Sequence, residues 1–141
     1  MPAIQQRHVG RERAVQALFS LENATPAELP QGLAHFWATV DEPTSAAASS
    51  FAEELIRGVI ENRASLDAAI QAQSESWRVE RMAKVDRNVL RLGAFELLHT
   101  DTPGRVVINE AVEIARTFGA EGSPAFVNGI LDKVARVAGR L

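Results

Sequence analysis

The sequence contains no cysteine and no tyrosine among its 141 residues. Without cysteine, the chain forms no disulfide, uses no thiol in catalysis and offers no thiolate to a metal ion. This composition fits a reducing compartment such as the cytoplasm. The chain also lacks an apolar run long enough to span a bilayer, and its N-terminus lacks the apolar core of a secretory signal. The sequence therefore predicts no membrane segment.

Sequence motifs for catalysis or cofactor binding are missing as well. There is no Gly-x-Gly-x-x-Gly, no Gly-Lys-Ser/Thr phosphate loop and no serine in a nucleophile elbow. Glu96 and His99 have half of the spacing that builds di-iron sites in helical bundles, but no second Glu-x-x-His exists. The sequence therefore predicts no catalysis, no cofactor and no metal site.

The balance of charge is mildly acidic, with a net charge of −3. Nucleic-acid-binding domains are usually basic, so any RNA site must be a local patch. Such a patch is present at the start of the first expected helix, where Arg7, His8, Arg11 and Arg13 surround a single acid, Glu12. Cations there oppose the helix dipole, at a cost of roughly 0.3–1 kcal/mol each. Two interpretations remain open: a solvated basic face, or a surface that a polyanion neutralises.

Apolar residues make up 46% of the chain and recur at intervals of three or four residues, as in helices that bury one face. No segment alternates apolar and polar residues as a strand does. The sequence predicts an all-α fold of about seven helices, in two small subdomains that cover roughly residues 1–62 and 63–141. We expect Trp37 and Trp77 to be core anchors rather than ligand platforms. The expected helices cover residues 7–22, 31–40, 45–62, 65–73, 77–98, 105–118 and 123–137, and a short turn precedes the core of the fifth.

The ends of the last two helices carry local signals. Gly119 is the residue type that stops a helix in the left-handed conformation. Ser123 is a good N-cap, and Pro124 suits the first helical position because no N–H is needed there. Gly129 falls inside the last helix, at a cost of about 1 kcal/mol relative to alanine. We expect a neighbouring helix to approach closely at Gly129.

Three blocks of the chain carry more specific patterns. Residues 11–19 read Arg-Glu-Arg-Ala-Val-Gln-Ala-Leu-Phe, and residues 77–98 contain Val-Asp-Arg followed by Leu-Arg. Residues 105–137 contain Val-Ile-Asn-Glu-Ala-Val-Glu-Ile-Ala-Arg-Thr-Phe-Gly and Phe-Val-Asn-Gly-Ile-Leu-Asp-Lys-Val. In this order, the blocks resemble the NusB family of bacterial transcription antitermination proteins, and the resemblance runs over nearly the whole chain.

The resemblance implies a cytoplasmic protein that consists of a single RNA-binding domain without a cofactor. NusB-like proteins pair with a small-subunit ribosomal protein, called NusE in this role, and the pair binds the single-stranded boxA element of nascent RNA. The complex then joins RNA polymerase with other Nus factors and supports ribosomal RNA transcription. Some relatives self-associate, so the choice between a monomer and a homodimer stays open.

The family's RNA-contacting arginines correspond to Arg7 and Arg11. His8 lies where the family usually has more basic residues, and Arg13 completes the same basic segment. Single-stranded binding weakens with a log–log salt slope of about −0.7 per neutralised phosphate, so three arginines would give a slope of roughly −2. So few neutralised phosphates contribute little electrostatic free energy to RNA binding by an acidic chain. We therefore expect weak RNA binding alone and a site that a basic partner completes.

Four further positions take roles from the resemblance. Phe118 and Phe126 match aromatic residues near the RNA path, where stacking contributes about 1–3 kcal/mol per base, although core packing is the alternative for both. Phe19 and Asp86 match positions that face the ribosomal partner. Gly122 stands where an acid can occur near the RNA.

Two other classes of protein remain as alternatives. NusB-like domains also form the N-terminal part of ribosomal RNA cytosine methyltransferases, but these residues supply no glycine-rich cofactor turn. A helical adaptor that binds only proteins would leave the arginines merely solvated. Charge reversal of Arg7 and Arg11 separates the adaptor from an RNA-binding protein.

Overall fold

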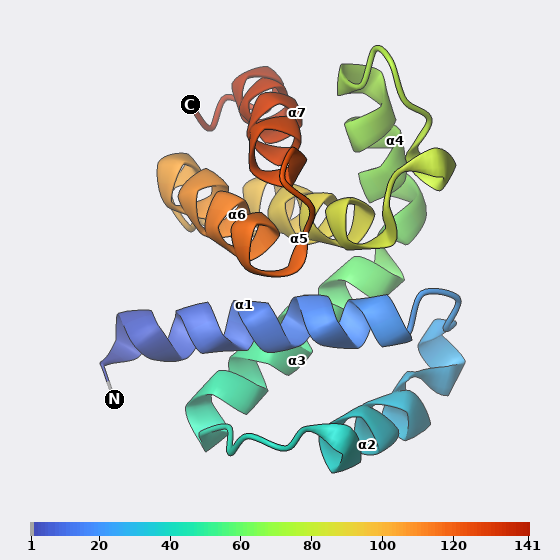
Figure 1. The fold of residues 1–141 in the computed structure, drawn as a ribbon, viewed down its shortest axis with the longest axis vertical. Helices are drawn as coiled ribbons and strands as arrows, with labels where there is room; N and C mark the ends of the chain where they lie inside the picture. Colours follow the sequence, from blue (N-terminus) through green and yellow to red (C-terminus); the bar gives the residue numbers. More distant parts are fainter. Residues whose placement is uncertain (1) are drawn as a thin grey trace. The chain divides into compact units, whose positions relative to one another are not determined.

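The computed structural model describes residues 2–141, and helices make up its regular structure (Figure 1). The predicted all-α fold is confirmed. The chain separates into two compact units, which meet in sequence between Glu61 and Asn62. The elements are α1 (Ala3–Ser20), η1 (Pro26–Glu28), α2 (Leu29–Thr39), α3 (Ala46–Glu61), α4 (Arg63–Gln73), η2 (Val79–Arg81), α5 (Lys84–His99), α6 (Gly104–Phe118) and α7 (Ser123–Val137), in which η denotes a 3₁₀ helix.

The first unit is built on the contact between α1 and α3. Apolar side chains of both helices are buried, among them Leu18 of α1 and Leu55 of α3. The helices cross closely at Gly10, where a Cβ atom would lie 2.9 Å from the Phe51 ring and 3.0 Å from the Ala48 carbonyl oxygen. This crossing places Phe51 beside the first turns of α1.

The second unit is built around α5, which contacts α4, α6 and α7 (Figure 1). Nine of its sixteen residues are buried, including Val89, Leu90 and Leu97. Helix α7 approaches α5 at Gly93, where a Cβ atom would lie 2.6 Å from Cδ1 of the buried Leu131. The α5 helix is therefore the central helix that its apolar stripes predict.

Several predicted helix boundaries are wrong in detail. The first helix begins at Ala3, before the basic segment. The fifth begins at Lys84, so Trp77 lies in the connection before it. Gly119 is extended, with φ −96° and ψ −170°, and is not left-handed. Glycine fits there because a Cβ atom would lie 2.6 Å from the Ser123 hydroxyl oxygen. The N-cap of α7 is Gly122, while the Ser123 hydroxyl accepts a 3.0 Å hydrogen bond from the Ala120 N–H.

Two expectations about packing are also wrong. Gly129 is exposed, and no atom lies within 4 Å of a Cβ built on it, so close helix packing does not explain this glycine. Trp77 is 54% exposed and is not a core anchor. Trp37 is half-buried, and its indole N–H donates a 2.7 Å hydrogen bond to Glu53.

Among residues 2–141, no helix combines the length and the apolar character needed to cross a membrane.

Two of the helical glycines, Gly93 and Gly129, lead to opposite predictions. Gly129→Ala should raise the free energy of unfolding by about 0.5–1 kcal/mol, because alanine loses less backbone entropy on folding and meets no neighbour. Gly93→Ala should lower it by about 1–3 kcal/mol, because the new methyl group displaces Leu131. Urea unfolding of both variants tests the pair. A loss of stability in Gly129→Ala would contradict the packing described for α7.

Candidate nucleic-acid interface

Phe51 of α3 organises the basic start of α1. The guanidinium carbons of Arg7 and Arg11 lie 5.1 and 5.2 Å from the centroid of its ring, within the range of cation–π attraction. Arg7 is exposed, whereas Arg11 is only 3% exposed. Arg7 is therefore held by an aromatic ring while its charge stays open to solvent. Sequence reasoning missed Phe51, because the contact depends on the crossing of two helices.

The other basic residues of α1 have local partners. His8 lies 3.6 Å from Glu12, one helical turn away. Arg13 is 8% exposed, and its Nε and Nη1 atoms donate 3.0 Å hydrogen bonds to Thr44 and Gln16. Its Nη2 atom lies 3.5 Å from the carboxylate of Glu42. Arg13 therefore ties α1 to the segment that precedes α3, and this structural role removes it from the candidate RNA surface.

The second unit contains a pocket of about 260 Å³. It brings together Asp86 and Phe126, which the sequence placed in two different functional groups. Oδ1 of Asp86 is buried and has no hydrogen-bond partner among the described residues. Phe126 is half-buried, and so is Phe118, which is not among the lining residues. The pocket is lined by Trp77, Arg81, Met82, Ala83, Asp86 and Phe126.

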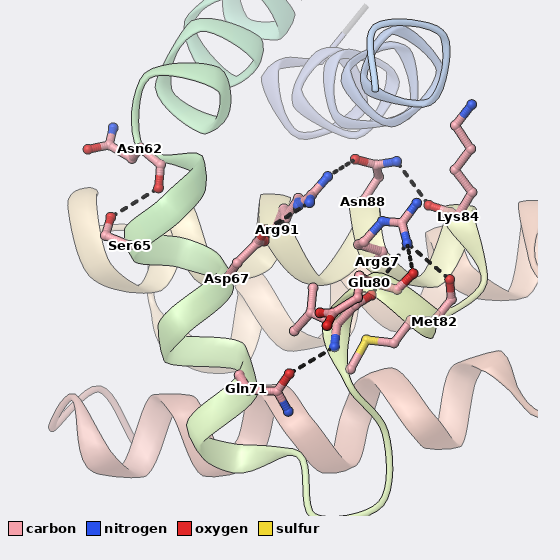
Figure 2. Close-up of polar contacts among 11 residues, drawn as sticks. Asn62, Ser65, Asp67, Gln71, Glu80, Met82, Lys84, Arg87, Asn88 and Arg91 are labelled. Atoms are coloured by element: carbon pink, nitrogen blue, oxygen red, sulfur yellow. Dashed lines mark hydrogen bonds and ion pairs between the residues drawn. The ribbon is translucent and has the colours of Figure 1, made fainter. Parts of the chain in front are cut away.

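Hydrogen bonds hold one wall of this pocket in place. Gln71 of α4 donates to the Trp77 carbonyl at 3.1 Å and accepts from the Val79 N–H at 2.9 Å. The Ser74 hydroxyl donates to the same Trp77 carbonyl at 2.7 Å. Figure 2 shows the guanidinium of Arg87, which donates to the carbonyl oxygens of Val79, Glu80 and Met82 at 3.2–3.4 Å. Hydrogen bonds from the α4 side and from α5 therefore both hold the connection between these two helices.

The same connection is a second basic segment, which the sequence analysis overlooked. Residues 78–87 contain four cations and two acids, so the segment carries a net charge of +2 in a chain of net charge −3. Glu80 is bound to Arg78 at 2.7 Å, and this hydrogen bond lowers the pKa of Glu80. Arg81 is exposed and lines the pocket. The exposed Trp77 lines the same pocket. A cation beside an exposed aromatic ring makes this part of the chain a candidate for contact with nucleic acid.

Comparison with known proteins identifies the family of this chain. The family model described as NusB matches residues 8–136. The chain belongs to the NusB family. The transcription antitermination protein NusB of Anaeromyxobacter dehalogenans (strain 2CP-1) is 53% identical over 125 residues, which are 89% of this chain and 87% of that protein.

Solved NusB structures share the fold. The structure of T. maritima NusB aligns with a TM-score of 0.79 and 37% identity, and covers 96% of this chain and 92% of that one. A crystal structure of the antitermination factors NusB and NusE in complex with dsRNA aligns with a TM-score of 0.76 and 25% identity, over 94% of this chain and 98% of that one. The predicted family and fold are confirmed.

Two further positions take their expected roles from the family resemblance. Phe19, at the end of α1, is 42% exposed. Gly122 is exposed at the start of α7, where a Cβ atom would meet nothing within 4 Å.

Among residues 2–141, no group of three or more His, Asp or Glu side chains is arranged to hold a metal ion.

A partly buried ion pair joins α4 and α5, the two helices that hold the pocket. Oδ1 and Oδ2 of Asp67 on α4 accept hydrogen bonds from Nε and Nη2 of Arg91 on α5, at 2.7 and 2.8 Å (Figure 2). Arg91 is 6% exposed. Asn88 accepts a 3.4 Å hydrogen bond from Arg91 and donates a 2.9 Å hydrogen bond to the Lys84 carbonyl. The bidentate geometry orients α5 against α4.

The structural role of Arg13 is testable by stability. Arg13→Met keeps most of the buried stem but removes the hydrogen bonds to Thr44 and Gln16, so the free energy of unfolding should fall by about 1–2 kcal/mol. Arg57→Met is the matched control, since Arg57 makes only a solvent-accessible ion pair with Glu53, and it should change stability by less than about 0.5 kcal/mol. Equal effects in chemical denaturation would show that Arg13 is no structural tie.

The ion pair makes a larger contribution. Asp67→Asn should lower the free energy of unfolding by about 1.5–3 kcal/mol, because the buried Arg91 loses a charged hydrogen-bond acceptor in a partly buried pair. Asp132→Asn breaks the exposed pair with Arg136 and should have no measurable effect. Guanidinium unfolding curves compare the two. If Asp67→Asn were as stable as Asp132→Asn, the pair would not anchor α5.

Proposed function

We propose that this chain is a transcription antitermination factor that binds RNA together with NusE. One observation carries the proposal: the likeness, over 94% of this chain, to a NusB that was crystallised with NusE and dsRNA. The curated relatives carry the name of antitermination proteins and are up to 53% identical. The role we propose involves no catalysis, and it places the chain in the bacterial cytoplasm with RNA polymerase and the other Nus factors.

We infer that the RNA is the single-stranded boxA element, although the related crystal contains dsRNA. Proteins read unpaired RNA mainly by stacking bases on aromatic or guanidinium planes. Arg7 beside Phe51 in the first unit, and half-buried Phe126 in the second, are side chains of this kind. We propose His8 in the first unit and Phe118 in the second as further RNA contacts, and both are half-buried.

The burial of two arginines supports a shared RNA site. Arg11 and Arg13 are less than 10% exposed, which leaves Arg7 as the exposed arginine among the first turns of α1. Each phosphate that a cation neutralises contributes a log–log salt slope of only about −0.7 for single strands. An acidic chain with so few available cations should bind RNA weakly by itself. We propose that NusE supplies the missing positive charge and that it docks near the exposed Phe19.

Charge reversal of the exposed arginine tests the proposal. At saturating NusE, Arg7→Glu should weaken binding of labelled boxA RNA roughly fivefold, the equivalent of one exposed ion pair of about 1 kcal/mol. The salt slope should become shallower by about 0.7. Arg57→Glu makes the same change in net charge on α3 and should leave both values unchanged. Fluorescence anisotropy in a salt series measures both quantities.

The same titrations separate the alternatives. RNA affinity that NusE leaves unchanged would contradict the shared site. Equal weakening by Arg7→Glu and Arg57→Glu would show that only the overall charge matters. A chain that binds NusE but no RNA, with or without NusE, would be a protein-binding adaptor.

A further inference from the structure

A pocket of about 300 Å³ lies in the first unit, between α1, the end of α2 and the connection that leads to α3 (Figure 1). This volume is at the small end of ligand sites, so the pocket has room for one long side chain but not for a helix. Arg7, Phe19 and Phe51 do not line it, so it lies outside the RNA and NusE contacts proposed for α1. The proposed function therefore assigns no role to this pocket.

Arg13 brings unused hydrogen-bond donors to the pocket. A guanidinium has five N–H groups, and the described residues accept three of those of Arg13. Its Nη1 and Nη2 atoms contact Gln16 and Glu42, which both line the pocket, so the end of the side chain lies at the pocket. Each Nη atom keeps one N–H without an acceptor among residues 2–141, although the side chain is only 10% exposed. Buried donors are almost always paired, so these two call for oxygen atoms that water or a ligand brings.

Two carboxylates also line the pocket. Asp41 and Glu42 are both exposed, and the side chain of Glu42 is 84% exposed. Glu42 reaches Nη2 of Arg13 at 3.5 Å, which is long for a charge-assisted hydrogen bond, so its carboxylate keeps most of its capacity to accept. Arg13 is the one cation among the described lining residues, and the pocket therefore carries more negative than positive charge.

The first unit as a whole is acidic. Residues 1–61 contain four cations and eight acids, a net charge of −4, whereas the complete chain has −3. Arg11 and Arg13 are buried, and Arg57 is paired with Glu53 at 3.4 Å. Such a field attracts a cationic group to the pocket and repels a phosphate from it, so a basic protein segment fits here better than RNA.

The remaining walls suit a long side chain with a charged end. Phe36 and Val40 supply apolar surface. An arginine or lysine buries its apolar stem on such surface and keeps its charged end among acceptors, which Asp41 and Glu42 provide. A metal ion or a polyamine has no acceptor for the two N–H groups of Arg13, whereas a peptide offers its backbone carbonyl oxygens. The pocket therefore matches a peptide segment rather than a free cation.

We propose that this pocket binds an arginine-containing segment of a basic partner protein. The arginine side chain lies on Phe36 and pairs with Asp41 and Glu42. A neighbouring backbone carbonyl oxygen of the same segment accepts the two unused N–H groups of Arg13. Arginine is preferred to lysine, because its planar guanidinium pairs with carboxylates through two parallel hydrogen bonds. The inference goes beyond the proposed function, since it needs no RNA and no contact at Phe19.

The test is an NMR titration of the isotope-labelled full chain with the tripeptide acetyl-Gly-Arg-Gly-amide. The Nε–H of Arg13, the side-chain amide of Gln16 and the backbone amides of residues 39–42 should shift together, while the signals of the second unit stay unchanged. Shifts that spread over both units would overturn the inference. The absence of a localised shift at the highest soluble peptide concentration would overturn it as well.

Charge-neutral variants test the two carboxylates. Asp41→Asn combined with Glu42→Gln should weaken tripeptide binding roughly tenfold, since each exposed ion pair contributes at most about fivefold. Glu54→Gln combined with Glu61→Gln, at exposed positions of α3, is the matched control and should bind like the unchanged chain. Equal weakening in both double variants would show that only the overall charge attracts the peptide. All four side chains are exposed, so the melting temperatures should stay unchanged, which separates lost binding from lost folding.

Two further probes test the chemistry of the ligand. Methylguanidinium carries the charge of arginine without a backbone carbonyl, so it should bind more weakly than the tripeptide. If it bound as tightly, the contact with Arg13 would be wrong. Acetyl-Gly-Glu-Gly-amide should not bind, and if it bound more tightly than the arginine peptide, the pocket would be an anion site. None of these measurements involves RNA or NusE, so a failure here would leave the proposed function standing.

Discussion

The ion pair between Asp67 and Arg91 is the interaction on which the candidate site depends. It joins α4 to α5, and each of these helices also holds the connection between them. Gln71 of α4 fastens one end of this connection, and Arg87 of α5 fastens the other. A partly buried ion pair adds little net stability compared with well-packed apolar residues, but the two parallel hydrogen bonds of this pair define one orientation. Here that orientation places Trp77 and Asp86 on one pocket.

Five of the chain's arginines fall into two groups with different tasks. Arg13, Arg87 and Arg91 satisfy carbonyl, hydroxyl and carboxylate oxygens inside the fold. Arg7 and Arg81 are exposed and are available to an outside anion. Part of the positive charge is thus used inside the fold, in a chain whose net charge is −3. This constraint makes a second, basic protein a natural part of RNA binding.

Helical spacing was enough to predict the fold but not every boundary. The apolar series Val79, Met82 and Val85 continues the stripe of α5 backwards, yet Val79 belongs to η2 and Met82 to the connection. A 3₁₀ turn buries residues three apart as a helix does, so the pattern does not distinguish the two. Gly129 has no structural explanation: it stands exposed inside α7 without a close neighbour.

The site was less predictable than the fold, for reasons that lie in tertiary contacts. The sequence placed Arg7 and Arg13 in one basic segment, and only Phe51 and Thr44, which come from the region around α3, separate their roles. Trp77 carries an apolar side chain within a strong family block, so burial was the natural expectation. In the structure it lies in the connection before α5, where Gln71 and Ser74 hold its backbone by hydrogen bonds that no residue pattern reveals.

Ultraviolet cross-linking of the complex of this chain, NusE and boxA RNA, followed by mass spectrometry, tests the central claim most directly. Aromatic side chains stacked on bases are expected to form the adducts. The account predicts RNA adducts on Trp77 and Phe126, which disappear when unlabelled boxA RNA competes. Adducts confined to other aromatic residues, such as Trp37 or Phe95, would contradict it.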